Sequence, residues 1–421
     1  MRELPSGWTR VALTDLVESA TDGPFGSNLK TEHYVEVPGV RVVRLQNIGS
    51  GTFDDSDHAY VSERHARVLS RHEVRGGDLL VASLGDENHP VARACTYPSH
   101  LPPGIVKADC FRIRVKHELV LAPFMQLVLN SYSGRKGLAG RFQGVTRDRI
   151  NLTSLLGWTI TIPPIKVQRR IADIIGALDF RISSVDLVIN KQLKALDGLT
   201  SALLAEDAAV VDPVRLGDAL IDIEAGWSPL CEEIPPPPGK WGVLKVSAVT
   251  SGAYVPSESK ILLPGMRPRP ELEVHPGDLI LCRANGVKSL VGVAALVRDT
   301  PSKLMLSDKL MRLVVDRSVV NNAYLELALA SADVRRQIDA ATSGSSGQNN
   351  ISQGFVRALR VRFPSLSRQG RVVACNEAGR SVVNALKAER GKLLTLKQGL
   401  MENLLTGRVR VPEAEAALED L

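Results

Sequence analysis

The sequence lacks the motifs by which most enzymes hold phosphates, metals or reactive nucleophiles. Its 421 residues contain no Gly-x-x-x-x-Gly-Lys-Ser/Thr loop and no Gly-x-Gly-x-x-Gly turn, the two patterns whose backbone N–H groups hold nucleotide phosphates. A His-Glu-x-x-His helix and a serine nucleophile elbow are also missing. An amino-methyltransferase is expected to carry an Asn/Asp-Pro-Pro-Tyr/Phe turn, and the nearest run, Ile-Pro-Pro-Ile at 162–165, lacks the amide or carboxylate that binds the amine. We therefore expect no catalytic residue, no metal site and no cofactor in this chain.

Paired cysteines and long apolar runs are absent as well. The five cysteines occur singly and form no Cys-x-x-Cys pair, which argues against a zinc ribbon or a disulfide framework and is typical of the reducing cytoplasm. The first residues contain no apolar signal-peptide core, and no segment approaches the ~20 apolar residues that a membrane span needs. We expect a cytoplasmic protein with no membrane partner.

What the sequence does contain is the composition of a globular protein with a surplus of basic residues. Hydrophobic residues make up 44% and charged residues 23%, so apolar material for sizeable cores is available. At ~100–200 residues per domain, the length allows two or three domains. The net charge of +6 and the pI near 9.1 favour a polyanionic partner.

The chain consists of two copies of one unit. At an offset of 201, residues 162–206 align with 363–407 without a gap, and ten of these 45 positions are identical, among them Gln168/Gln369. The preceding regions match more loosely, since Glu-Val-Arg-Gly-Gly-Asp-Leu-Leu at 73–80 corresponds to Glu-Val-His-Pro-Gly-Asp-Leu-Ile at 273–280. Each copy therefore comprises a mixed region followed by a helical segment.

The leading part of each copy is predicted to be rich in β-structure. Short β-branched runs separated by Gly, Pro, Asn and Asp are typical of short strands joined by long loops. Such runs occur at 40–45, 79–82, 111–115, 158–162, 279–282 and 310–315. We predict an α+β fold with two β-rich domains, 1–163 and 208–363, related by a pseudo-twofold repeat.

The trailing parts, 164–207 and 364–410, are predicted to be long helices that separate the two domains. In the first, apolar residues recur every seven positions in two rows four residues apart, as in a coiled-coil seam. The predicted seam comprises Ile171, Ile175, Leu178, Ile182, Val185, Ile189, Leu196, Leu199 and Leu203, with Leu386, Leu393, Leu400 and Leu404 in the second copy. Since the nearest partner for one helix is the other copy, we expect an antiparallel coiled coil. An acidic tail, 411–421, follows.

These helical residues also carry a resemblance to a known family. The pattern Pro163-Pro164…Gln168…Ile171-Ala172…Leu178-Asp179…Ile182, closing with Leu203-Leu204, resembles the conserved helical regions of type I restriction–modification specificity subunits. The second ending, Leu-Leu-Thr-Gly-Arg at 404–408, and the opening, with Asp-Gly-Pro-Phe-Gly-Ser at 22–27 and Val-Val-Arg-Leu-Gln-Asn-Ile at 42–48, are similar to that family too. The resemblance covers the whole chain in family order. It departs at Val167, where the family usually has an acidic residue before the glutamine, and in the second helix, which has Pro364-Ser365 in place of the double proline and Arg368 before Gln369.

The resemblance implies a function without catalysis. In such subunits each recognition domain reads one half of a bipartite asymmetric DNA site, and the helices set the unread gap and dock the methyltransferases. The implied partners are double-stranded DNA, two modification subunits and restriction subunits. The modification subunits methylate adenine N6 with S-adenosylmethionine and the restriction subunits use ATP and Mg, so these cofactors belong to the partners.

Basic, amide and hydroxyl side chains near strand ends are the candidate DNA contacts, because such groups bind phosphates and base edges. Between Arg135 and Arg170 the chain has eight basic residues against one acidic residue, and 147–151 corresponds to 348–352 of the second copy. The candidates are Ser27, Lys30, Arg44, Asn47, Arg147, Arg149, Asn151, Lys245, Arg283, Asn285, Gln348, Asn349 and Asn350. Each position also suits an ordinary solvated loop.

Two other functions stay open at this point. One is an adaptor whose two β-rich modules bind proteins or glycans instead of DNA, and the other is a free-standing methyltransferase, which the missing catalytic turn disfavours. Strongly salt-dependent retention on duplex DNA separates the first from a DNA-binding protein, because phosphate binding releases counterions.

Overall fold

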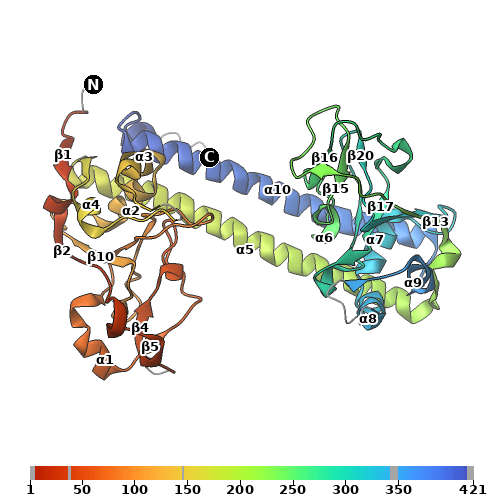
Figure 1. The fold of residues 1–421 in the computed structure, drawn as a ribbon, viewed down its shortest axis with the longest axis horizontal. Helices are drawn as coiled ribbons and strands as arrows, with labels where there is room; N and C mark the ends of the chain where they lie inside the picture. The colour runs from red at the N-terminus through yellow and green to blue at the C-terminus, as the bar shows by residue number, and fades with distance from the viewer. Residues whose placement is uncertain (1–4, 37–38, 145–146, 342–348, 415–421) are drawn as a thin grey trace. The chain divides into compact units, whose positions relative to one another are not determined.

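The computed structural model describes residues 5–36, 39–144, 147–341 and 349–414, and it divides into two compact units (Figure 1). The first unit comprises residues 1–186 together with 388–421, and the second comprises residues 187–387. Both unit boundaries fall inside long helices, so each unit contains part of both helices. Within the described ranges, no helix is long and apolar enough to cross a membrane.

Among its described residues, the first unit contains three small sheets. Its four-stranded antiparallel sheet has the order β2-β10-β7-β8, and its five-stranded sheet, in which β4 and β9 are parallel, has the order β3-β5-β4-β9-β6. The pair β1-β11 completes the set. The strands are β1 (Thr9–Ala12), β2 (Val17–Thr21), β3 (Tyr34–Val35), β4 (Val40–Val43), β5 (Tyr60–Val61), β6 (Glu73–Val74), β7 (Leu79–Ala82), β8 (Ala94–Thr96), β9 (Gly104–Val106), β10 (Cys110–Val115) and β11 (Thr159–Ile162).

The second unit repeats this topology. Its sheets have the orders β13-β21-β17-β19 and β14-β16-β15-β20, the latter again with one parallel pair, β15 and β20, and the pairs β12-β23 and β18-β22 stand beside them. The strands are β12 (Val214–Arg215), β13 (Leu220–Ala225), β14 (Cys231–Glu232), β15 (Gly242–Leu244), β16 (Ser259–Leu262), β17 (Leu279–Cys282), β18 (Ala284–Asn285), β19 (Ala294–Leu296), β20 (Leu304–Met305), β21 (Leu310–Val315), β22 (Asn349–Asn350) and β23 (Arg360–Val361). The repeated strand order confirms the predicted α+β fold with two β-rich domains.

Short helices accompany the sheets, and α2 packs on β7 and β8 as α7 packs on β17 and β19, whereas α1 lies away from the long helices (Figure 1). The first unit has α1 (Glu63–Val68), α2 (Ala122–Asn130), α3 (Tyr132–Leu138) and α4 (Leu152–Leu156). The second has α6 (Ser247–Thr250), α7 (Asn322–Ala330), α8 (Ala332–Ala341) and α9 (Gln353–Ala358). In the second unit one apolar core joins the sheet to both long helices, because Leu203, Leu204, Val372 and Val373 pack into it.

The two long helices are α5 (Ile165–Val210) and α10 (Leu366–Leu405). The first continues three residues beyond the predicted segment, and the second ends before Gly407, whose φ of +67° is left-handed and terminates the helix. In the first unit Asp179 pairs with Lys397 and Asp186 with Arg390, each at 2.5 Å. In the second, Asn376 donates to Thr200 at 2.9 Å and Arg368 pairs with Asp207 at 2.8 Å. Numbers rise along α5 as they fall along α10, so the helices pack antiparallel.

The polar residues that interrupt the apolar rows of α10 all have a polar partner on α5. Asn376, Arg390 and Lys397 are the positions that break the heptad row, and each contacts the facing helix. At Gly379 an added Cβ would lie 2.5 Å from Leu196, so the glycine admits that leucine. Arg368, which departs from the family pattern, also has polar partners on α5, because it forms ion pairs with Glu206 and Asp207.

One predicted seam residue lies outside the seam. Leu199 is 47% exposed, whereas Ile171, Ile175, Leu178, Ile182, Val185, Ile189 and Leu196 are each at most 9% exposed. Leu393 and Leu404 are buried, and Leu203, Leu386 and Leu400 are half-buried. A straight α-helix drifts by ~20° per heptad from a strict seven-residue repeat, and Leu199 is four heptads from Ile171. At Leu199 the heptad row of α5 has therefore rotated away from the interface with α10.

Candidate nucleic-acid interface

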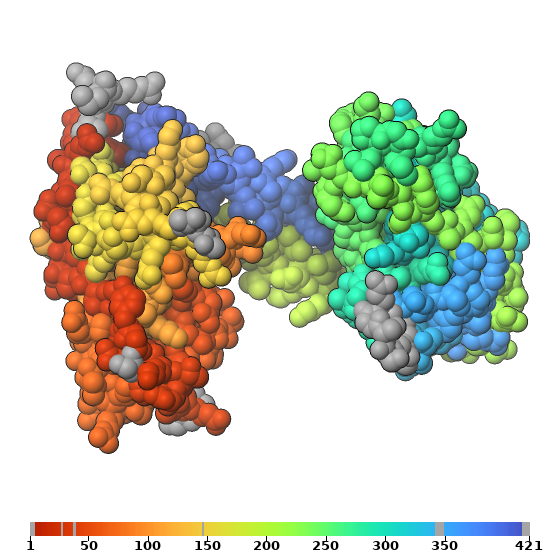
Figure 2. Space-filling model, viewed as in Figure 1, coloured from red at the N-terminus to blue at the C-terminus, as the bar shows by residue number. Residues whose placement is uncertain are grey.

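In the first unit, the candidate segment with Arg147 and Arg149 is joined to the loop after β7 by backbone hydrogen bonds. Ile150 donates to the Ser83 carbonyl at 2.9 Å and Gly85 donates to the Asp148 carbonyl at 2.9 Å. Arg149 and Gln143 exchange two more bonds, of 2.7 and 2.8 Å. Residues 148–150 are thereby attached to the loop that follows β7. Figure 2 shows the yellow surface of this region adjoining the red and orange surface of the earlier residues on one face of the first unit.

The second unit has the same junction. Ile351 donates to the Arg283 carbonyl at 3.0 Å, and strands β18 and β22 pair Ala284 with Asn350 and Asn285 with Asn349. Four residues that the sequence nominated from two separate segments therefore lie side by side: Arg283, Asn285, Asn349 and Asn350. Gln348 lies outside the described residues.

Arg147 and Arg149 differ in their surroundings. The side chain of Arg149 is 48% exposed and contacts Asp109 at 2.6 Å. Arg147 is exposed and, within the part of the chain that the structure describes, has no hydrogen-bond or ion-pair partner. An unpaired exposed guanidinium attracts phosphate, whereas a guanidinium held by a carboxylate is oriented and partly neutralised. The two residues thus suit different contacts with a polyanion.

The half-buried carboxylate of Asp22 lies near Arg149. Burial raises the pKa of Asp22 to about 6, and the nearby Asp109 carboxylate adds to the effect while Arg149 opposes it. The Oδ1 atom of Asp22 is buried and has no hydrogen-bond partner among the described residues. This acidic pair and its arginine form a polar cluster next to the candidate segment 143–151.

The loop after β4 is organised by an aspartate that the sequence analysis did not single out. Arg44 pairs with Asp57, and Gln46 donates to the same carboxylate at 2.6 Å. Asn47 is 0% exposed, because both N–H groups of its amide are used by the carbonyls of Asp54 and Asp57, at 2.9 and 3.0 Å. Asn47, a predicted DNA contact, is therefore buried and holds the shape of the loop. Arg44 and Gln46 lie at the edge of the loop.

The remaining candidates are separate from these junctions or serve the local backbone. The Asn151 side chain caps α4 by accepting from Ser154 N–H at 2.7 Å. Lys30 is exposed and lies 3.8 Å from Glu32, next to the short 3₁₀ turn Gly26–Asn28 that contains Ser27. Lys245 lies 3.3 Å from Glu233. The cap role of Asn151 was visible in the sequence as Asn before a short apolar run, and the acid partners were not.

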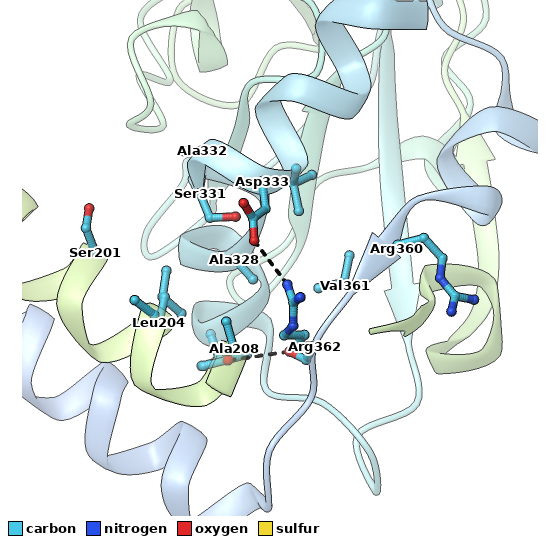
Figure 3. A pocket seen from close by; sticks show the side chains of 13 residues that line it. Ser201, Leu204, Ala208, Ala328, Ser331, Ala332, Asp333, Arg360, Val361 and Arg362 are labelled. Atoms are coloured by element: carbon cyan, nitrogen blue, oxygen red, sulfur yellow. Dashed lines mark hydrogen bonds and ion pairs between the residues drawn. The ribbon is translucent and has the colours of Figure 1, made fainter. Parts of the chain in front are cut away.

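The second unit also contains a cavity of about 200 Å³ between the end of α5, the start of α8 and β23 (Figure 3). Its walls are mostly small, with Ser201, Ala208, Ala328 and Ala332, and Arg362 bonds Asp333 across it at 3.1 Å. No predicted DNA-contact residue lines it.

The equivalent place in the first unit is occupied. Glu402 corresponds to Ser201 in the repeat, and its carboxylate accepts from the N–H groups of Tyr132 and Ser133 at the start of α3, the latter at 3.2 Å. Among the described residues, no group of three or more His, Cys, Asp or Glu side chains could hold a metal ion.

Comparisons with known proteins agree with this architecture. No family profile matches the chain. The type I restriction enzyme EcoEI specificity subunit of Escherichia coli is 38% identical over 176 residues, which span 41% of this chain and 30% of that relative. The EcoKI specificity subunit of Escherichia coli strain K12 is 22% identical over 422 residues, covering 97% of this chain and 89% of the relative.

Solved structures share the fold. A chain from a structure on the complex assembly and conformational transition of the type I restriction–modification system has a TM-score of 0.59 at 18% identity, covering 97% of this chain and 100% of that one. The S subunit of a type I system from M. genitalium has a TM-score of 0.52 at 14% identity, covering 96% and 98%. The resemblance noted from the helical motifs is thus confirmed. The chain is a homologue of the type I restriction enzyme specificity subunits.

Proposed function

We propose that this chain is the DNA-specificity subunit of a type I restriction–modification complex. Each unit reads one half of a bipartite asymmetric site, and α5 and α10 set the gap between the halves and dock two modification subunits. The chain itself catalyses no step. Adenine methylation with S-adenosylmethionine belongs to the modification subunits, and ATP- and Mg-dependent cleavage belongs to the restriction subunits.

The repeated junction is the observation that carries this proposal. The bond from Ile150 to Ser83 in the first unit recurs as the bond from Ile351 to Arg283 in the second, and polar or basic side chains surround both. The two junctions have equivalent backbone bonds but carry different side chains, Arg147 and Arg149 in the first unit and Asn349 and Asn350 in the second. This difference suits a protein that reads two different sequences. Arginine pairs best with guanine, and asparagine with adenine.

Methylation mapping tests the proposal directly. DNA from cells that carry this chain with its modification subunits is sequenced for N6-methyladenine, and we expect one bipartite motif with a fixed gap. Replacing residues 1–160 by the corresponding domain of a relative is expected to change one half of the motif and to leave the other half and the gap intact. Alteration of both halves would contradict separate reading by the two units.

Duplex binding separates this function from that of a protein–protein adaptor. Because Lys and Arg contacts release counterions, retention of the chain on duplex DNA should fall steeply between 50 and 200 mM salt, on the order of 10³-fold for six phosphate contacts. Salt-independent retention, or none, would favour the adaptor.

A further inference from the structure

We infer that Arg93 is a positioning residue that holds the two candidate reading segments of the first unit in one arrangement. The inference rests on the proposed function and goes beyond it, since Arg93 itself is too buried, at 4% exposed, to contact DNA. It lies immediately before β8, outside every segment that the sequence nominated.

The Arg93 guanidinium bonds four backbone carbonyls from two loops. Its Nε donates to Ile48 at 2.6 Å and its Nη2 donates to Leu45 at 2.9 Å, both in the loop after β4. Its Nη1 donates to Leu84 at 2.9 Å and more weakly to Pro90 at 3.4 Å, both in the loop after β7. One side chain therefore ties the two loops together.

Each of these loops carries or supports candidate contacts. The first displays Arg44 and Gln46 on either side of Leu45. In the second, Leu84 forms a β-bridge with Arg149, so residues 148–150 are attached to this loop. Through Arg93 the backbone that carries Arg44 is tied to the backbone that carries Arg149. A displacement of about 1 Å between two groups is enough to spoil a designed contact geometry.

Arginine is suited to this position because its donors form a planar fork that can reach acceptors on both sides at once, whereas the three donors of a lysine ammonium share one nitrogen. Burial of a charge among carbonyls, with no carboxylate bonded to it, is unfavourable and needs all of its hydrogen bonds.

The second unit has no arginine at the position equivalent to Arg93. Ala92 and Gly292 are equivalent, because their N–H groups bond the carbonyls of Ala82 and Cys282 at 2.9 and 2.8 Å, so Val293 occupies the place of Arg93. The β18–β22 pair of the second unit corresponds to the Leu84–Arg149 bridge of the first, so it does not replace the link that Arg93 makes to the loop after β4. Loss of Arg93 should therefore affect one half-site only, and the other half-site is an internal control.

The test uses the complete complex of this chain with its modification subunits. Wild type, Arg93→Lys, Arg93→Met and Ile113→Val each select sites from a randomised duplex library, and methylation of the selected site is compared with that of single mismatches in each half. Ile113 is buried in β10 at 0% exposure and is paired with Ala20 and Leu79, outside both loops, so its variant is a control for a change in core packing.

Both Arg93 variants are expected to lose discrimination at the first half-site by roughly tenfold, the effect of one lost base contact, and to keep it at the second. Ile113→Val should keep both. Wild-type reading of the first half-site by Arg93→Lys, or an equal loss at both half-sites, would overturn the inference. If Arg93→Met does not fold, Arg93→Lys decides alone. Failure of the proposed function is distinct, since the wild-type complex would then select no sequence.

Discussion

At the residue scale, the glutamines identical in both copies show what the repeat preserves. Gln168 accepts from Leu121 N–H at 3.0 Å and donates to Leu119 and Pro163, and Gln369 makes the same bonds to Asn321, Val319 and Pro364 at 2.8–3.0 Å. Both are 0% exposed. Each glutamine fastens the start of a long helix to the loop that precedes α2 or α7.

Removing one of these glutamines should destabilise its unit. Gln168→Leu leaves a buried N–H and two buried carbonyls without partners, so we expect the free energy of unfolding to fall by about 1–3 kcal/mol. Thermal unfolding measures this. Gln192→Leu is the control, because Gln192 is exposed on the same helix. Equal stability of the two variants would show that the hydrogen bonds of Gln168 do not contribute to the stability of the unit.

Arg147 and Arg149 should contribute differently to the salt dependence of duplex binding. Arg147→Ala with Arg149→Ala is expected to weaken duplex binding and to lower the slope of log K against log salt by up to about 2. Because Asp109 already pairs with Arg149, Arg147→Ala alone should account for most of the change. Arg67→Ala, an exposed arginine of α1 paired with Glu63, is the control. An unchanged slope in the double variant would exclude this segment from the interface.

Asp22 should make stability depend on pH. Its pKa in the folded protein is about 6, above the value of 3.8 of a free aspartate. The unfolded chain therefore loses this proton first, and stability falls as the pH rises from about 4 to about 6. Asp22→Asn removes this loss. We expect it to be more stable than wild type at pH 7–8, by ~1 kcal/mol because water screens the half-buried site, and equal to it below pH 4.

Denaturant unfolding of both proteins at pH 4, 6 and 8 checks this prediction. A constant difference between wild type and Asp22→Asn across that range would mean that the carboxylate does not titrate there.

At the element scale, the sequence predicted the strands and helices better than their contacts. Heptad spacing identifies the buried row of α5, because one face of a helix recurs every three or four residues. It does not reveal that Asp179 faces Lys397 or that Gly379 admits Leu196, since the register between two helices is a long-range property. Nor could spacing expose Arg93, Asp57 or Asp109, which have partners as many as 48, 13 and 40 residues away.

The cavity at the start of α8 leads to a prediction about this element. The N–H groups of Ala332 and Asp333 have no acceptor within the described part of the second unit, whereas Glu402 supplies one at the equivalent helix of the first. Ser201→Glu should fill the cavity and stabilise the helix start by ~0.5–1 kcal/mol. Hydrogen exchange at 332–335 should slow, and Tm should rise.

Ser201→Gln is the matched control, since it has the same length without the charge. Equal Tm values for the two variants would show that the charge of the carboxylate does not stabilise the start of α8.

At the scale of the whole molecule, the continuity of α5 and α10 through both units matters for the gap. Pairs on either side of the unit boundary, Asp186 with Arg390 and Thr200 with Asn376, fix the register of the two helices. An insertion in α5 alone breaks this register. An insertion after Gln192 must therefore be matched by one after Val383 in α10.

Paired insertions of four residues should lengthen the unread gap. Four residues add ~6 Å and rotate the helix by ~40°. Two base pairs add ~7 Å and ~70° in the same sense, at 3.4 Å per pair and ~10–10.5 pairs per turn. We expect a gap longer by one or two pairs, with both half-sites unchanged in methylation maps.

Paired insertions of seven residues are the control, because they preserve the heptads but rotate the helix ~20° backwards. They should lower methylation more strongly. Recovery of the original gap from an active four-residue variant would show that the helices do not set the spacing.

The discontinuity of the first unit has a consequence for how the protein is made. Residues 1–186 leave the ribosome long before 388–421, while the second unit is one uninterrupted stretch, 187–387. At ~5–20 residues per second, the 201 intervening residues take about 10–40 s to synthesise. During that time the apolar row from Ile171 to Val185 has no Leu393 or Leu404 to cover it. The part made first is thus completed last, and a nascent chain stalled near residue 387 presents a finished second unit beside an open first one that offers a site for chaperones.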